Sequence, residues 1–119
     1  AFSIMVGLAL AAAEELSKQG IEAEVIDLRT LRPLDTETIV NSVKKTGCLL
    51  IVHEAMKRAG AAGEIAMRVT EAAPDVVKAM KTPIRRLAAQ NIALPHSVAI
   101  EEKIIPQTDD IIKAARELV

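Results

Sequence analysis

A histidine and a glutamate, His53 and Glu54, stand directly after one of the most apolar stretches of the sequence, residues 48–52. Such a stretch predicts a buried strand, and α/β sheets place ligand-facing groups at the carboxyl ends of their strands. An imidazole beside a carboxylate offers acid–base chemistry. Adjacent residues of an extended chain point to opposite sides, however, so the two groups are poorly placed to act together. We therefore favour a polar contact at a subunit boundary over a direct catalytic role.

A second candidate is the glycine-bearing segment 60–64, which precedes a predicted helix. The amino end of a helix attracts anions. The segment nevertheless lacks the Gly-x-Gly-x-x-Gly spacing and the lysine of a phosphate-binding loop. In addition, Glu64 at the helix start would repel a phosphate. A flexible turn with close packing is therefore favoured over an anion site.

The remaining polar side chains of interest are isolated in the sequence. His96 has no second histidine or cysteine at ligand spacing, which argues against a metal site. Arg85 and Arg86 are neighbours on a predicted strand, so they face opposite ways and at least one lies at the surface or an interface. Glu101 and Glu102 form an acidic spot in a long loop, where plain solvation and a basic partner are both open interpretations. Without a Ser-His-Asp set or a paired-carboxylate site, the residues indicate an assembly or binding domain.

The scaffold for these residues is predicted from the apolar periodicity, which alternates strands and helices. We expect helices over residues 5–20, 35–46, 64–73 and 108–119, a short turn or helix over 75–81, and strands over 22–28, 48–52 and 83–87. Asp35 and Thr108 are the expected N-caps, and Val119 is expected to face inward. Residues 91–107, punctuated by two prolines, are expected to be irregular. The alternation predicts a mostly parallel sheet with helices on both sides.

Composition narrows the class of protein. Half of the 119 residues are hydrophobic and 26% are charged, which is typical of a globular domain. A formal net charge of −1 gives no electrostatic reason to expect nucleic acid or a membrane surface. The single cysteine, Cys48, lies in an apolar run and is interpreted as a small buried hydrophobe in a reduced compartment. We expect a soluble, cytoplasmic protein, or one of the mitochondrial matrix if the source is eukaryotic.

The first residues resemble the end of a strand that leads into a helix. Ala1, Phe2 and Ser3 precede the apolar pattern that begins at Met5, with no room for the strand itself. We expect residues 1–119 to form a single domain, and the chain to be a fragment of a longer protein.

Several motifs carry a resemblance to a known family. They are VIDLRTLRPLD at 25–35, SVKKTG at 42–47, HEA at 53–55, GEI at 63–65, TPIRR at 82–86 and IPQ at 105–107. In this order and spacing they resemble the C-terminal domain of transketolase-like enzymes. The sequence is most similar to the beta subunit of the thiamine-dependent first component of 2-oxo acid dehydrogenase complexes, of the pyruvate or branched-chain type.

The resemblance implies a three-layer αβα domain with a mixed, mostly parallel sheet of about five strands, which follows a pyrimidine-binding domain. It implies no catalytic, cofactor or metal residue here, because thiamine diphosphate and Mg²⁺ are held between the alpha subunit and the preceding domain of the beta subunit. The implied partners are the alpha subunit, a second beta subunit and the small basic binding domain of the acyltransferase core. The candidate interface and docking residues are His53, Glu54, Arg86, His96, Glu101, Glu102 and Val119. The sequence departs from the family by lacking aromatics at 56–57, 76–78 and 95–96.

Two alternatives remain open from the sequence. Asp27, near the end of a predicted strand, has the setting of a phospho-acceptor in a receiver-like signalling module. Such a module needs an acidic pair at the end of its first strand to hold Mg²⁺, and residues 1–3 do not supply it. The other alternative is the C-terminal domain of a different transketolase-family enzyme, such as a transketolase or a deoxyxylulose-phosphate synthase.

Overall fold

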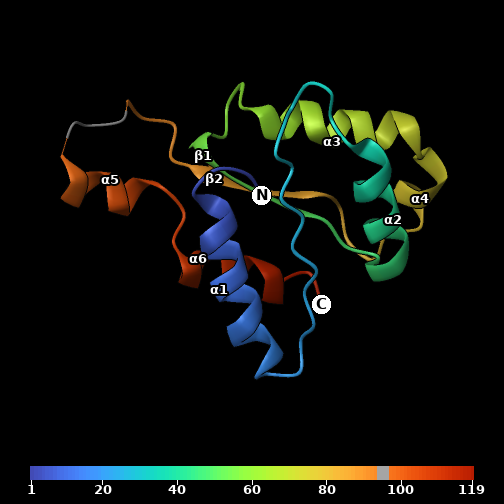
Figure 1. Cartoon of the computed structure of the whole chain (residues 1–119), viewed down its shortest axis with the longest axis horizontal. Helices are drawn as coiled ribbons and strands as arrows, with labels where there is room; N and C mark the ends of the chain where they lie inside the picture. The colour runs from blue at the N-terminus through green and yellow to red at the C-terminus, as the bar shows by residue number, and fades with distance from the viewer. Residues whose placement is uncertain (94–96) are drawn as a thin grey trace.

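A computed structural model describes residues 1–93 and 97–119, leaving out the side chains of residues 98, 99 and 102. Along this part of the chain the elements follow the order α1 (Met5–Ser17), α2 (Thr36–Thr46), β1 (Leu50–Met56), α3 (Ala61–Ala72), α4 (Pro74–Lys78), β2 (Arg85–Ala89), α5 (Val98–Ile104) and α6 (Thr108–Arg116) (Figure 1). The two strands pair in parallel, with Leu50 opposite Arg85 and Val52 opposite Leu87.

The helices form two layers around these strands. Ile51 of β1 packs into a cluster built mainly with α2 and α3, whereas the next residue, Val52, packs into a second cluster with α1 and α6. Consecutive side chains of a strand point to opposite faces, so one apolar strand contributes side chains to both clusters. The first cluster comprises Leu28, Ile39, Val40, Val43, Ile51, Ala62, Ile65 and Val69, and the second Met5, Ala12, Val52 and Ile111. The predicted three-layer αβα fold is confirmed.

The sheet is narrower than expected. In the described residues it contains two strands, not about five. Residues 22–28, predicted as a strand, form no regular secondary structure and pair with neither β1 nor β2. The other two strands begin two residues later than predicted and continue further, so that His53 and Glu54 belong to β1 itself. The reason is that pairing between β1 and β2, rather than apolar character alone, decides where each strand ends.

The helix predictions need three corrections. Residues 91–107 are not irregular throughout, because α5 forms over Val98–Ile104 between the two prolines. The N-cap of α6 is Gln107 and not Thr108, since the carboxylate of Asp110 accepts a hydrogen bond from the Gln107 amide at 3.0 Å. Finally, Val119 does not face inward: the helix ends at Arg116 and the Val119 side chain is 73% exposed.

Asp35 caps α2 as predicted. Its carboxylate accepts hydrogen bonds from the Thr38 hydroxyl at 2.6 Å and from the Thr38 amide at 3.0 Å. These bonds, the hydroxyl first, hold the pKa of the Asp35 carboxyl below its ordinary value of 3.8. The charged carboxylate of Asp35 therefore stabilises the first turn of the helix.

We expect Asp35→Ala to lower the melting temperature by about 3–6 °C, because an amide of the first turn loses its acceptor. Asp35→Asn is the matched control, since it keeps an oxygen acceptor and loses the charge. The depressed pKa means that the cap stabilises fully above the ordinary value of 3.8 and that this stabilisation is lost as the pH falls through the folded-state pKa. Thermal unfolding at about pH 7 and about pH 3 measures both effects. An equal melting temperature for Asp35→Ala and the wild type at neutral pH would contradict the prediction.

Candidate functional site

His53 lies midway along β1 and at the centre of a small polar group. Its side chain is fully buried, and the ring of Phe2 stacks on it with 6.0 Å between ring centroids and 24° between planes. Neither ring nitrogen has a hydrogen-bond partner in the described part of the chain. The sequence did not predict the role of Phe2, although the signal was present: it is the only aromatic residue in the chain.

Gly60 completes the wall around this imidazole. A Cβ atom at this position would lie 2.4 Å from Cε1 of His53 and 2.4 Å from the carbonyl oxygen of Met56. The φ angle of Gly60 is −78°, which any residue adopts, so the glycine is required by space and not by backbone conformation. The prediction of close packing in the segment 60–64 is confirmed.

The surroundings of His53 favour the neutral imidazole. Burial lowers the pKa of His53 from its ordinary value of 6.5, the positive charge of Arg86 lowers it further, and the carboxylate of Glu54 acts in the opposite direction. A group with a depressed pKa that faces the interior is suited to a fixed structural role at neutral pH. It is poorly suited to act there as a charged surface contact.

The two arginines of β2 diverge as predicted. Arg85 extends toward α6, where its Nη1 lies 2.7 Å from Oε2 of Glu117. Arg86 extends toward α3, where its Nη1 lies 3.5 Å from the position that a Cβ of Gly63 would occupy. Both arginines are exposed. Arg86 therefore offers a cationic group beside the buried imidazole of His53.

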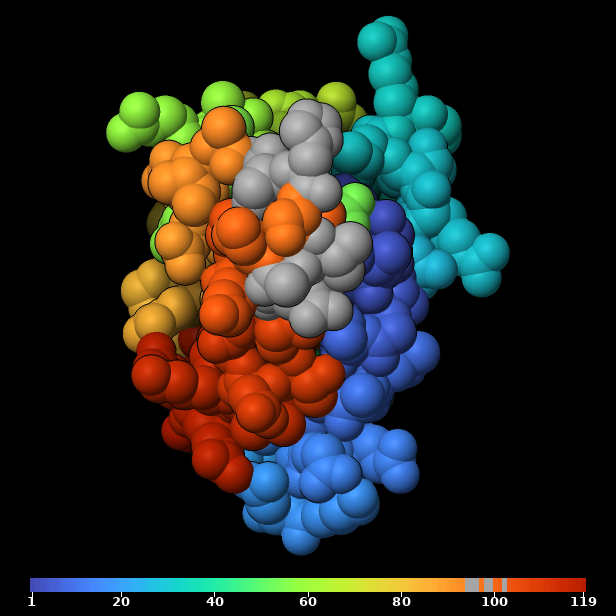
Figure 2. All heavy atoms as spheres, turned by 90° about the vertical axis from the view of Figure 1, so that its left-hand side faces the viewer, coloured from blue at the N-terminus to red at the C-terminus, as the bar shows by residue number. Residues whose placement is uncertain are grey.

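The other candidate residues are spread over the molecule. Glu54 is half-buried next to His53 in β1, and Glu101 is half-buried in α5. In Figure 1, α5 lies at the far left while the C-terminus lies near the lower centre, and α5 (orange) faces the viewer in Figure 2. Glu101 and Val119 therefore do not form one patch. His96 and the side chain of Glu102 lie outside the described residues. The structure thus brings together His53, Glu54 and Arg86, and leaves Glu101 and Val119 apart.

A search of the described residues finds no group of three or more histidine, cysteine, aspartate or glutamate side chains that could hold a metal ion. In the same residues, no helix is long and apolar enough to cross a membrane. Cys48 is half-buried, and its thiol donates a hydrogen bond to the carbonyl oxygen of Leu118 at 3.2 Å.

The architecture is that of a three-layer αβα domain whose helices cover both faces of a parallel sheet. Comparison with known proteins makes the class specific: the family model "Transketolase, C-terminal domain" matches residues 1–111. The chain belongs to this family. The receiver-like alternative is correspondingly disfavoured, and the carboxylate of Asp27 is already paired with Nε of Arg29 at 2.8 Å.

Similar proteins are named as subunits of one enzyme. The "Pyruvate dehydrogenase E1 component subunit beta-1, mitochondrial" of Oryza sativa subsp. japonica is 45% identical over 116 residues, which are 98% of this chain and 30% of that protein. The "Pyruvate dehydrogenase E1 component subunit beta" of Bacillus subtilis is 40% identical over 118 residues, which are 99% of this chain and 35% of that protein. The chain therefore spans about a third of the length of these relatives.

A solved structure agrees with the fold. It is described as "Split gene transketolase, inactive beta4 tetramer" and superimposes with a TM-score of 0.80 at 26% identity, covering 98% of this chain and 36% of that one. The resemblance inferred from the motifs is confirmed by these comparisons. Sequence identity is higher to the pyruvate dehydrogenase subunits than to this transketolase.

Proposed function

We propose that this chain is the assembly and docking domain of the beta subunit of a 2-oxo acid dehydrogenase of the pyruvate dehydrogenase type. The observation that carries the proposal is the 40–45% identity to pyruvate dehydrogenase E1 beta subunits over almost the whole chain. In this proposal the domain supports thiamine-dependent oxidative decarboxylation through subunit contacts. The parent enzyme would lie in the mitochondrial matrix of a eukaryote or in the cytoplasm of a bacterium.

The thiamine chemistry belongs, in this proposal, to other parts of the parent enzyme. Mg²⁺ bound with a diphosphate takes carboxylate and carbonyl oxygens in a near-octahedral arrangement. We propose such a site for other parts of the parent enzyme; the described residues of this chain hold no group of three or more histidine, cysteine, aspartate or glutamate side chains that could bind a metal ion. No step of the reaction is therefore assigned to this chain.

The division of labour is tested by calorimetric titration of the 119-residue chain with thiamine diphosphate and Mg²⁺. We expect no heat of binding. Binding with a dissociation constant in the micromolar range, or decarboxylation of a 2-oxo acid by this chain alone, would overturn the proposed division.

The proposed partners are the alpha subunit, a second beta subunit and the small basic binding domain of an acyltransferase core. For contact with the subunits we propose the group around His53, where Glu54 of β1 is half-buried and Arg86 of β2 is exposed. For the basic binding domain we propose α5, with Glu101 and Glu102, and His96, which precedes this helix in the sequence. The exposed Val119 lies apart from α5 and is proposed as a second, separate contact. Opposite charges across such a surface set the rate of association and the choice of partner.

We expect Glu101→Gln to weaken binding of the basic acyltransferase-core domain about threefold to tenfold, and the effect to shrink at high salt. Glu71→Gln is the matched control, because Glu71 is an exposed glutamate on the separate helix α3. Calorimetric titration at low and high ionic strength measures both variants. Equal weakening by the two substitutions would show a general charge effect and would contradict docking at α5. Tighter binding to a transketolase partner than to the acyltransferase domain would favour the other transketolase-family assignment.

A further inference from the structure

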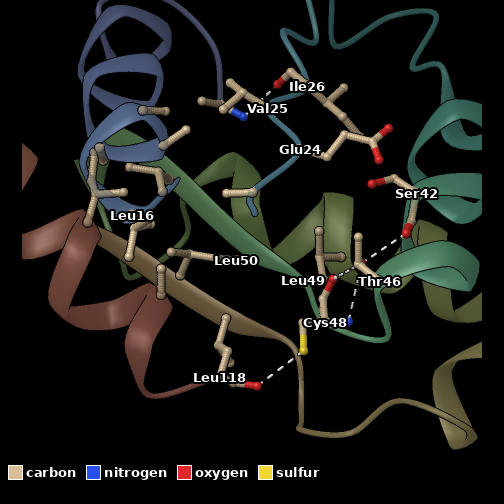
Figure 3. A pocket seen from close by; sticks show the side chains of 18 of the residues that line it. Leu16, Glu24, Val25, Ile26, Ser42, Thr46, Cys48, Leu49, Leu50 and Leu118 are labelled. Carbon is tan, nitrogen blue, oxygen red and sulfur yellow. Dashed lines mark hydrogen bonds between the residues drawn. The ribbon is translucent and has the colours of Figure 1, made fainter. Parts of the chain in front are cut away.

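A groove of about 450 Å³ lies between strand β2 and helix α6. The charged residues that line it are Lys57, Arg85, Arg86, Asp110, Lys113 and Glu117. The cavity of about 570 Å³ beside β1, where Figure 3 shows Leu16, Ile26 and Leu50, has a mostly aliphatic lining instead. In the groove beside β2 four basic residues outnumber two acidic ones, so this groove carries a net positive charge at neutral pH.

Both acidic side chains of the groove are already engaged by neighbours on this chain. The carboxylate of Glu117 pairs with Nη1 of Arg85 at 2.7 Å. The carboxylate of Asp110 accepts a hydrogen bond from the Gln107 amide at 3.0 Å. The remaining basic residues of the groove form no ion pair with any residue that the structure describes; they are Lys57, Arg86 and Lys113. The groove therefore offers cationic groups to an anionic partner.

The backbone of β2 borders this groove with an open edge. The Arg85 amide donates a hydrogen bond to the Leu49 carbonyl at 3.0 Å, so Arg85 turns its backbone groups toward β1. Backbone groups alternate in direction along a strand, and those of Arg86 and Ala88 must therefore point away from β1. Among the described residues, no backbone hydrogen bond outside the pairing of β1 with β2 reaches either residue. This edge of β2 is thus available to a further strand.

The open edge has a defined end. The Gln90 amide, which shares the direction of the Arg86 and Ala88 amides, donates a hydrogen bond to the Ile104 carbonyl at 3.3 Å. Ile104 is the last residue of α5. The chain itself therefore closes the edge at position 90 and leaves it open over residues 84–88.

The charges beside the edge decide which kind of strand fits it. Arg85 and Arg86 project to the two faces of the sheet, so a strand laid against β2 meets a cation on either face. A second copy of the chain that added its own β2 would bring arginines close to arginines, and like charges across a strand pair are destabilising. A segment with acidic side chains would meet opposite charges instead. The edge therefore favours an acidic partner over self-association.

We propose that the open edge of β2 binds an extended acidic segment of a partner protein, which adds one strand to the sheet and places its carboxylates in the groove against Lys57 and Lys113. Backbone hydrogen bonds to Arg86 supply the affinity of strand addition, and the charges of the groove select the partner. This surface differs from α5, proposed above for a basic domain, because it takes a partner of the opposite charge. The inference rests on the geometry of β2 and α6 and is independent of the proposed function.

The test uses the 119-residue chain and the fluorescently labelled peptide acetyl-Glu-Val-Glu-Val-Glu-amide, whose glutamates lie on one face of a strand. Fluorescence anisotropy measures the affinity, and amide hydrogen exchange followed by NMR locates the peptide. We expect exchange at the Arg86 amide to slow at least ~10-fold when the peptide is saturating. We expect little change at the Leu87 amide, which points toward β1.

Lys113→Glu is expected to weaken binding of this peptide about fivefold to tenfold, because an attraction is replaced by a repulsion. Lys44→Glu is the matched control, since Lys44 is likewise an exposed lysine in the last turn of a helix and lies on α2, away from the groove. We expect the control to change the affinity less than about twofold. Thermal unfolding of both variants verifies that each is folded.

Three outcomes would overturn the proposal. Equal affinity for a peptide with lysine in place of glutamate would show that charge does not select the partner. Equal affinity for the glutamate peptide with every peptide nitrogen methylated would exclude strand addition, because that peptide has no N–H group to donate. Slow exchange at Arg86 that grows with protein concentration in the absence of peptide, with a doubled mass by light scattering, would assign the edge to a second copy of the chain.

Discussion

Gly60→Ala is expected to lower the free energy of unfolding by about 2–3 kcal/mol. The added methyl group would lie 2.4 Å both from Cε1 of His53 and from the carbonyl oxygen of Met56. The imidazole cannot retreat easily, because it is fully buried and stacked on Phe2. The Met56 carbonyl belongs to the backbone, so relief requires the end of β1 to move. Chemical denaturation of the purified variant measures the loss.

Gly7→Ala is the matched control for this substitution. Gly7 lies within α1, and a Cβ there would meet nothing within 4 Å. We expect this change to stabilise the chain by about 0.5–1 kcal/mol, as a glycine replaced by alanine in an exposed helix does. The double variant Gly60→Ala with His53→Ala separates the two clashes, since only the one with the ring is removed. A decrease in the free energy of unfolding of less than about 0.5 kcal/mol for Gly60→Ala alone would contradict the prediction. It would mean that the loop before α3 can move to accommodate the added methyl group.

Lowering the pH from about 7.5 to about 5.5 is expected to destabilise the chain through His53, at up to ~1.4 kcal/mol per pH unit. Burial, the charge of Arg86 and the opposing charge of Glu54 together leave the pKa of His53 below its ordinary value of 6.5. In the unfolded chain the imidazole takes up a proton near 6.5, whereas in the folded chain it does so only at lower pH. The unfolded state then binds more protons, so stability is complete above 6.5 and falls as the pH drops below it.

His53→Leu is expected to flatten this dependence, because it removes the titrating group and keeps an apolar side chain in the buried site. His96→Gln is the control, since it removes the only other histidine of the chain. Denaturant unfolding at intervals of half a pH unit measures all three proteins. An unchanged slope in His53→Leu would place the proton uptake on another group.

The layers of this fold could be predicted from the sequence, but the number of strands in its sheet and their pairing could not. The apolar run at 48–52 predicts a buried strand, and the spacing of apolar residues over 5–16 predicts a helix with one buried face. Both elements are present, as β1 and α1. Residues 22–28 have the same strand-like pattern, yet their pairing depends on a neighbour that local sequence cannot specify. The helix α5 was missed because the prolines on either side dominated the interpretation of that segment.

The candidate site shows the same limit. The divergence of Arg85 and Arg86 follows from strand geometry and was predicted. The burial of His53 was not, because it depends on Phe2, which is fifty-one positions away in the sequence, and on the absence of a side chain at Gly60. Contacts of this kind become visible only when the chain is folded. The placement of polar groups on the surface could be anticipated, and the packing beneath them could not.

The two hydrophobic clusters meet at adjacent residues of one strand, Ile51 and Val52. The peptide unit between Ile51 and Val52 therefore connects the two halves of the interior. A change in the packing between β1 and the helices α1 and α6 is expected to rotate β1 about its axis. The same rotation would change the packing of β1 against α2 and α3. A disturbance at one outer surface of the domain is therefore expected to reach the other through this single strand.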